Sequence, residues 1–265
     1  MLGIGNDLNA STLSSLAWQP DAAPVRDGLA TAADRTSVAG GVARMLEAAN
    51  QAAAVPGRDG GERTLLASED SVTAGGVRDA YDLQLFREAD GSLTLDMAMA
   101  IDFNFVDGER GLDWNAQDKQ QFIEDFERVV LESWDGHTIT TDEGQEVTLS
   151  IDLDIHELGT PGSGDGNWTV DIIRIEEGGF SQSYVIPSQN TGVFDSEDVK
   201  PVHKGASDPQ VGAAHEFGHM IGLPDEYNGR AGPEAMKDTD SLMHTGMDVR
   251  ERHMDLFESW VESVH

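Results

Sequence analysis

One segment, HEFGHMIGLPD beginning at His215, constrains the chain more than any other part of the sequence. His215 and His219 are four residues apart, so on a helix both side chains project from one face and can bind the same metal ion. Glu216 lies beside the first histidine, where it can take a proton from water at the metal. Gly222 allows a sharp turn out of the helix, after which Asp225 can return as a third ligand. The segment predicts a zinc site of His215, His219 and Asp225, with Glu216 as the catalytic base.

The third ligand of this site has two candidates in the sequence. Asp225 follows the second histidine by six residues, and Glu226 is adjacent and could compete for the metal. The chain has no cysteine, which excludes disulfides and thiolate ligands, so a metal must be bound by histidines and carboxylates. A carboxylate ligand also lowers the net charge of the metal centre, which makes a bound water less acidic than three histidines would.

A second motif, Ser241-Leu242-Met243-His244, follows the first. With HExxHxxGxxD, it gives the chain a resemblance to the metzincin zinc metallopeptidases, whose Met-turn places a methionine beneath the metal. The aspartate at the third ligand position resembles the small bacterial snapalysin type. The resemblance implies a zinc endopeptidase, a hydrolase acting on protein or peptide substrates, with Met243 in the Met-turn. It also implies that Glu216 passes the proton of the attacking water to the leaving amine.

The chain departs from the metzincin pattern after the second motif. Some members carry a tyrosine two residues after the Met-turn methionine, whereas this chain has Thr245 there. Tyr227 could stabilise the oxyanion instead, or could serve in packing. His244 could support a ligand or belong only to the local structure.

The remaining sequence predicts an α+β fold. Residues 92–106 alternate between apolar and polar side chains, which predicts a long half-buried strand, paired with residues 81–86 across Asp90-Gly91. A helix over 115–134 is predicted from its apolar stripe, Phe122, Phe126, Val129, Val130 and Trp134. Further strands are predicted at 138–141, 147–155, 168–175 and, as a sheet edge ended by Pro187, 180–186.

Three further helices are predicted, two of them with a capping residue at the start. Asp208 is expected to cap the metal-binding helix, with Pro209 as its first residue, and Asp248 to cap a last helix. Another helix is expected over 36–54. The order of elements resembles the upper subdomain of a metzincin, which implies a twisted mixed sheet with a backing helix and an active-site helix.

The expected organisation is an N-terminal segment followed by one catalytic domain. Residues 1–75 are rich in Ala and Gly and could be a pro-segment, a delivery segment or a flexible extension. Residues 76–265 are the expected metallopeptidase domain, with an upper subdomain over 76–222. Its lower subdomain, 223–265, would hold the Met-turn and a terminal helix.

The charge balance limits the partners of the chain. With 17 Lys and Arg against 49 Asp and Glu, its formal net charge is −32, which excludes nucleic acid and anionic membrane surfaces as partners. The Gly- and Asp-rich stretch 159–167 is expected to be a turn, with a loop that binds additional calcium as the alternative. No apolar run reaches the length of a membrane span.

The first eighteen residues lack the charged and apolar regions of a secretory signal peptide. We therefore expect a protein that stays in the cytoplasm until a signal-peptide-independent route exports it, as a secreted or injected effector. Secretion machinery, or an inhibitor or immunity protein, would then be a partner. The alternative from another class is a non-catalytic binding or structural protein whose metal is structural, although such a site has no use for Glu216.

Overall fold

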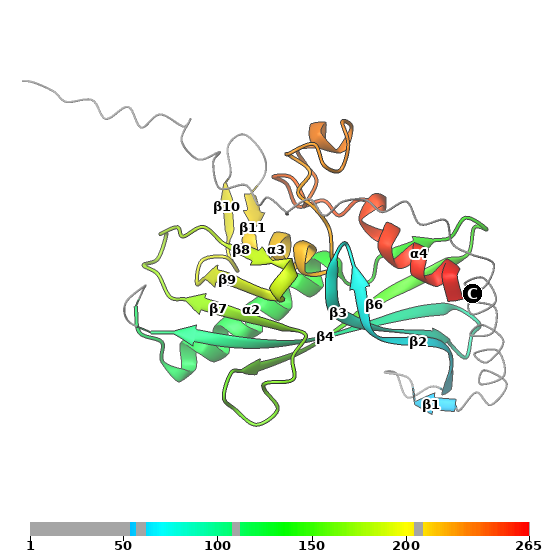
Figure 1. Ribbon diagram of the computed structural model, residues 1–265, viewed down its shortest axis with the longest axis horizontal. Helices are drawn as coiled ribbons and strands as arrows, with labels where there is room; N and C mark the ends of the chain where they lie inside the picture. Colours follow the sequence, from blue (N-terminus) through cyan, green and yellow to red (C-terminus); the bar gives the residue numbers. More distant parts are fainter. Residues whose placement is uncertain (1–53, 57–61, 108–111, 204–208, 265) are drawn as a thin grey trace, which may run out of the picture. The chain divides into compact units, whose positions relative to one another are not determined.

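The computed structural model describes residues 54–56, 62–107, 112–203 and 209–264, which form a mixed α+β fold with a curled sheet (Figure 1). This confirms the predicted α+β class. The strands are β1 Ala54–Pro56, β2 Glu62–Ala74, β3 Val77–Arg87, β4 Leu93–Val106, β5 Thr138–Thr140, β6 Glu146–Glu157, β7 Trp168–Ile173, β8 Tyr184–Ile186, β9 Thr191–Asp195, β10 Pro201–His203 and β11 Pro209–Val211. The α-helices are α2 Ala116–Trp134, α3 Gly212–Met220 and α4 Asp255–Val264, with short 3-10 helices at Pro187–Gln189, Ala235–Lys237 and Glu251–Met254.

The long strand β4 organises the sheet. Its first half pairs antiparallel with β3, and its second half pairs parallel with β7 along the same edge. Strand β6 runs parallel to β4 along the opposite edge, from Leu93 to Phe103 of β4. The alternating apolar side chains of β4 are buried, as predicted, and the predicted hairpin with β3 is confirmed. Because β4 has different partners along its length, the sheet curls rather than remaining flat.

Helix α2 backs the sheet and agrees closely with its prediction. Asn115 caps it by accepting a hydrogen bond from the Asp118 amide, and the predicted apolar stripe is buried. The rings of Phe126 on α2 and Phe103 on β4 meet edge to face, with centroids 5.0 Å apart. At the end of the helix, Trp134 Nε1 donates to the carbonyl oxygen of Ala214 over 2.9 Å. This bond ties α2 to α3, the helix that carries the histidines.

The edge of the sheet is more elaborate than the sequence predicts. The expected edge strand over 180–186 is limited to β8, which pairs antiparallel with β9. Strand β9 was not predicted, and it lies between β7 and β8. Its five residues, Thr191–Asp195, are too few for apolar alternation to stand out from the surrounding loops. Strand β8 therefore remains at the edge of the described sheet, but one strand further out than expected.

Two predicted helix starts are wrong. Pro209 belongs to β11 rather than to the first turn of α3, which begins at Gly212 without a side-chain cap. The amide of Ala213 donates instead to the carbonyl oxygen of Asp198 over 2.9 Å, which replaces the expected cap, and Asp208 lies outside the described residues. Asp248 does not cap a helix either, because its backbone amide and carbonyl bond to the loop around Asp240 and Leu242.

The sheet begins earlier in the chain than expected. Strand β2, which the sequence assigned to the segment 1–75, pairs along its length with β3. Register shifts between β2 and β3 interrupt the alternation of buried and exposed side chains along β2. Only the last residues of β2, including Val72 and Ala74, are buried. The helix predicted over 36–54 lies outside the described residues except for Ala54, which begins β1. A truncation that removes the N-terminal segment without breaking the sheet must therefore end before Ala54, because β1 pairs with β2.

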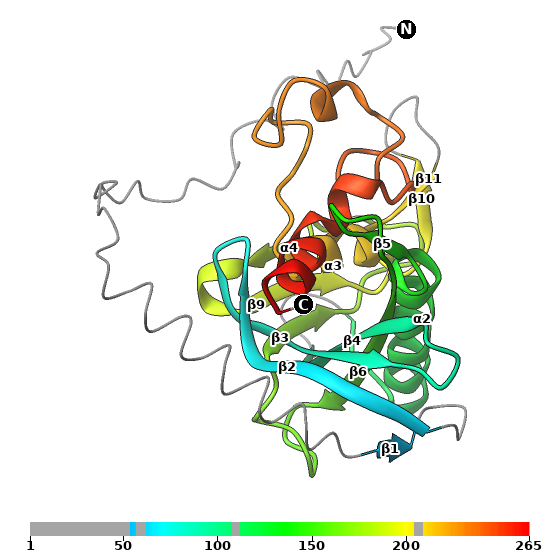
Figure 2. The same cartoon turned by 90° about the vertical axis from the view of Figure 1, so that its right-hand side faces the viewer.

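The tip of the β2–β3 hairpin packs against the turn that follows α3. Gly75 has a φ of +56°, and a Cβ there would overlap the carbonyl oxygen of Gly222. Gly222 has a φ of +99°, and its own Cβ would lie 2.6 Å from the carbonyl oxygen of Ala74. Figure 2 shows this hairpin beside α4, where the rings of Tyr81 and Phe257 have centroids 5.6 Å apart. Because neither glycine has a Cβ, the backbone of the hairpin tip can pack directly against the turn that leads to Asp225.

This contact predicts unequal effects of two neighbouring substitutions. Gly75→Ala should lower the free energy of unfolding by about 2–4 kcal/mol, because it adds both overlap and a left-handed residue. Gly76→Ala is the matched control, since Gly76 has a φ of +91° but nothing within 4 Å of its Cβ position. It should cost about 1 kcal/mol. Denaturant unfolding of both variants checks the difference, and equal losses would contradict the packing argument.

Candidate metal centre

The structure brings the three predicted ligands together at one point. His215 and His219 lie on α3 with their rings nearly perpendicular and their centroids 4.9 Å apart. Asp225 returns from the turn, and its Oδ1 lies 3.4 Å from His215 Nε2 and 3.1 Å from His219 Nε2. These donor atoms are close enough to share one ion. The four-residue spacing of the histidines and the turn at Gly222 together produce this arrangement.

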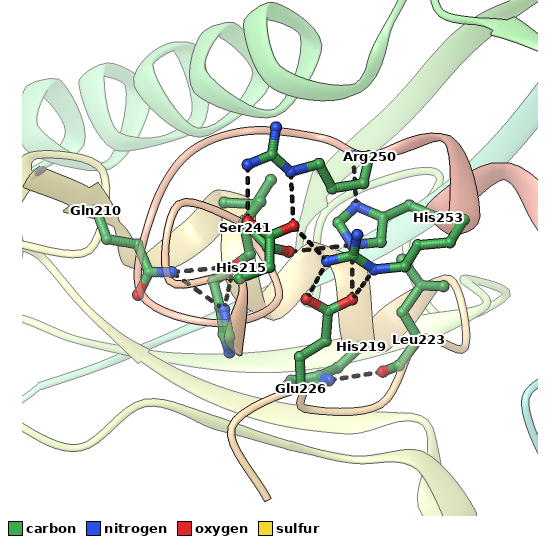
Figure 3. A network of polar contacts seen from close by, with 11 residues as sticks. Gln210, His215, His219, Leu223, Glu226, Ser241, Arg250 and His253 are labelled. Atoms are coloured by element: carbon green, nitrogen blue, oxygen red, sulfur yellow. Dashed lines mark hydrogen bonds and ion pairs between the residues drawn. The ribbon is translucent and has the colours of Figure 1, made fainter. Parts of the chain in front are cut away.

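Backbone carbonyls set the orientation of both histidine rings. His215 Nδ1 lies 2.7 Å from the carbonyl oxygen of Leu242, and His219 Nδ1 lies 2.8 Å from that of Leu223 (Figure 3). A carbonyl only accepts, so each Nδ1 donates and each Nε2 is left with a lone pair facing Asp225. This is the tautomer that metal-binding histidines adopt when their second nitrogen is held by the protein.

The site requires a positive charge between these atoms. Asp225 Oδ1 is buried and, with both histidines in this tautomer, has no hydrogen-bond donor in the described part of the chain. Burial raises the pKa of Asp225, but the hydrogen bonds and charges that the two histidines supply when they are protonated outweigh it and hold that pKa well below its usual range. Burial lowers the pKa of His219, yet its hydrogen bond to Asp225 and the charges of Glu216 and Asp225 raise it to about 9. A proton or a metal ion can supply this charge, and two nitrogens with one carboxylate oxygen suit zinc.

Glu226 does not face the two histidines, because other side chains bind its carboxylate. Its side chain is buried, and its two carboxylate oxygens accept hydrogen bonds from Arg252 Nε and Nη2, each over 2.7 Å (Figure 3). His253 Nε2 lies 3.1 Å from the same carboxylate. These contacts hold Glu226 in the C-terminal part of the chain, so Asp225 is the carboxylate that faces the histidines. His253 is satisfied within this network, since its Nε2 also contacts Ser241 Oγ.

Glu216 lies on α3 beside the two histidines with one oxygen unused. Its side chain is 92% buried, as its relative exposure is 8%. Its Oε2 is buried without a hydrogen-bond partner among the residues that the structure describes. A buried carboxylate oxygen is costly when it has no donor, so such atoms mark places where a ligand or water binds.

Met243 packs against α3. It is fully buried, and a Cβ on Gly218 of α3 would overlap its Sδ. The carbonyl oxygen of Met243 also accepts from the amide of Glu226 over 3.0 Å. The turn at 241–244 therefore supports α3 from below and fixes the residue next to Asp225.

Gln210 is a residue of the site that sequence reasoning missed. It lies on β11, and its Nε2 donates to the carbonyl oxygens of Leu242 and Gly246 over 2.9 and 3.1 Å. It thereby holds the carbonyl that orients His215. No local pattern could identify it, because β11 has three residues and Gln210 acts on a loop more than thirty residues away.

Tyr227 and His244 lie at the side of the site. Tyr227 is half exposed, and burial followed by the charge and hydrogen bond of Asp225 raises its pKa. Its ring meets that of His244 edge to face, with centroids 6.0 Å apart. His244 Nδ1 lies 3.1 Å from Thr245 Oγ1. Tyr227 therefore interacts directly with Asp225, one of the three candidate metal ligands, whereas His244 contacts Tyr227.

The stretch predicted as a turn or a calcium loop makes hydrogen bonds both within itself and to β4. The amide of Gly159 donates to Ser163 Oγ, and that of Gly164 to Asp102 Oδ2. Among the described residues, a second group with the spacing to bind a cation consists of Asp142, Glu258 and Glu262, which lies outside this stretch.

Comparison with known proteins adds no assignment, since no protein-family model and no curated protein matches the chain. Within the described residues, no helix combines the length and the apolar character that crossing a membrane requires.

The two adjacent carboxylates should respond differently to neutralisation. Asp225→Asn should weaken zinc binding by more than the roughly 10–100-fold that loss of a supporting residue costs, because it removes a ligand charge. Glu226→Gln should keep zinc affinity near that of the parent and lower the free energy of unfolding by about 1–3 kcal/mol. Competition with a chromophoric zinc chelator and denaturant unfolding measure the two effects. The reverse pattern would assign the ligand to Glu226.

Proposed function

We propose that the chain is a zinc-dependent endopeptidase of the metzincin type. The observation that carries the proposal is the convergence of His215 Nε2, His219 Nε2 and Asp225 Oδ1 beside an unpartnered oxygen of Glu216. Three protein ligands are typical of catalytic zinc sites, whereas structural sites use four and have no need of a base. The Met-turn sequence around Met243, packed beneath α3, adds support.

Each residue of the candidate metal centre has its own role in peptide hydrolysis. His215, His219 and Asp225 would hold zinc, which when bound polarises a carbonyl group and makes water more acidic. Glu216 accepts the proton of the attacking water and delivers it to the leaving amine, so the water oxygen adds to the carbonyl carbon and the C–N bond breaks. This role requires an unoccupied oxygen, and Glu216 Oε2 has no partner within the part of the chain that the structure describes.

Tyr227 is suited to stabilise the charge that develops on the carbonyl oxygen. Its raised pKa keeps the hydroxyl protonated at neutral pH, so it can donate a hydrogen bond. Its half-exposed position next to Asp225 leaves it accessible to a substrate.

The edge strand β8 offers a place for the peptide chain. Strand β8 pairs with β9 along one edge, and its other edge has no partner strand among the described elements. An extended peptide can add to such an edge through main-chain hydrogen bonds. Such binding is independent of substrate sequence, which suits an endopeptidase.

Replacing the base tests the proposal. Glu216→Gln should lower kcat for an unfolded, fluorescently labelled casein by about 10²–10⁴-fold, because proton transfer is lost, while zinc binding is retained. Chelation of the metal should abolish the activity of the parent, and re-addition of zinc should restore it.

Glu124→Gln on α2 is the matched control, since it makes the same chemical change on the exposed side of another helix. It should leave the rate unchanged. If Glu216→Gln cleaves as fast as the parent, the proposed mechanism is wrong.

A further inference from the structure

A small, open pocket lies beside Glu216 on α3. Its walls come from the loop that precedes β8, the turn that follows β9, the strands β10 and β11, and the start of α3. Glu216 belongs both to this pocket and to the candidate metal centre. A side chain bound here would therefore lie next to the group that performs the chemistry.

The pocket is acidic. Asp195, Glu197, Asp198 and Glu216 line it, and none of its described lining residues is Lys or Arg. Lys200 pairs with Glu197 over 2.7 Å, but it does not line the pocket. Burial and then the charge of Asp195 raise the pKa of Asp198 to about 7. The crowding of carboxylates means that a bound cation would gain electrostatic energy here.

Gln210 provides an observation independent of this acidic cluster. Its side chain is 1% exposed, and its amide nitrogen is directed to the carbonyls of the loop around Leu242. The amide oxygen points away from those contacts (Figure 3) and is buried without a hydrogen-bond donor in the described part of the chain. The amide oxygen of Gln210 is therefore a buried acceptor atom that requires an N–H or O–H group from a ligand.

The mouth of the pocket is apolar. Phe180 and Val202 both line it and are 68% and 39% exposed. Exposed apolar side chains above buried acceptors match a ligand with an apolar stem and a polar, cationic end. Phe180 can also contact a cation through the face of its ring.

We propose that this pocket binds the side chain of a Lys or Arg residue of the substrate, next to the bond that is cleaved. The methylene stem packs against Phe180 and Val202, and the ammonium or guanidinium group donates to Gln210 Oε1 and to the carboxylates of Asp195 and Asp198, which leaves Glu216 free. The proposal rests on the proposed endopeptidase function for its substrate, but binding of the cationic group itself does not depend on catalysis. The net charge of −32 would also attract basic substrates from a distance.

A binding experiment on the full chain tests the pocket without catalysis. N-butylguanidinium should bind at least about tenfold more tightly than N-butylurea, its neutral counterpart of nearly the same shape, as measured by calorimetric titration. Asp198→Asn should weaken guanidinium binding by about tenfold and leave urea binding unchanged. Asp165→Asn, which removes one exposed charge from the loop between β6 and β7, is the matched control and should have no effect.

The comparison of the two ligands on the parent protein needs no variant, so it remains decisive if Asp198→Asn fails to fold. Equal affinity for the two ligands would overturn the proposal. An equal loss of affinity in Asp198→Asn and Asp165→Asn would also overturn it, because the attraction would then be a general effect of net charge.

Mapping of cleavage sites separates this inference from the proposed function. Mass spectrometry of an unfolded protein digested by the parent should place Lys or Arg at one fixed position beside most cleaved bonds. A peptide with Lys at that position should be cleaved at least about tenfold faster than the same peptide with norleucine.

Two other outcomes would separate the assignment of the pocket from the proposed peptidase function. Cleavage without this preference would overturn the assignment of the pocket and leave the peptidase standing. Binding of N-butylguanidinium without cleavage of any substrate would overturn the peptidase, and with it the substrate side chain, and leave a cation-binding pocket.

Discussion

The hydrogen bond from His215 Nδ1 to the carbonyl oxygen of Leu242 is the contact on which the candidate site depends. Helix α3 has nine residues, and on its own it cannot fix the rotation of its histidine rings. Leu242 belongs to a loop that lies more than twenty residues further along the chain, and Gln210 holds the same carbonyl from the other side. The ligand geometry therefore follows from packing between three segments rather than from the helix alone.

Several contacts keep that loop against the helix. Met243 packs beneath Gly218, and Trp134 at the end of α2 donates to the carbonyl oxygen of Ala214. The carboxylate of Glu226 pairs with Arg252 and contacts His253, which fixes the chain immediately after Asp225. Of the two neighbouring carboxylates, one faces the histidines and the other holds the fold. This division explains how Asp225 can be directed at the histidines from a turn without regular structure.

Negative charge is concentrated where positive ligands are expected. On one side of Glu216, Asp225 and the histidine lone pairs converge on a point that requires a proton or a metal ion. On its other side, a pocket collects three further carboxylates and the unpartnered oxygen of Gln210. Buried acceptors without donors are unfavourable unless a cation or a donor group binds. The same physical requirement therefore underlies both the metal centre and the proposed recognition of a basic side chain.

The sequence by itself determined the features that repeat along a strand or a helix: the alternation of β4, the buried stripe of α2, and the four-residue spacing of His215 and His219. Such patterns are local, because side-chain direction follows from backbone periodicity. Only the tertiary structure decided that Asp225 rather than Glu226 faces the histidines, that β2 and β9 join the sheet, and that Gln210 lines an acidic pocket. These features depend on hydrogen bonds and close packing between segments far apart in the chain, which leave no periodic trace in the sequence.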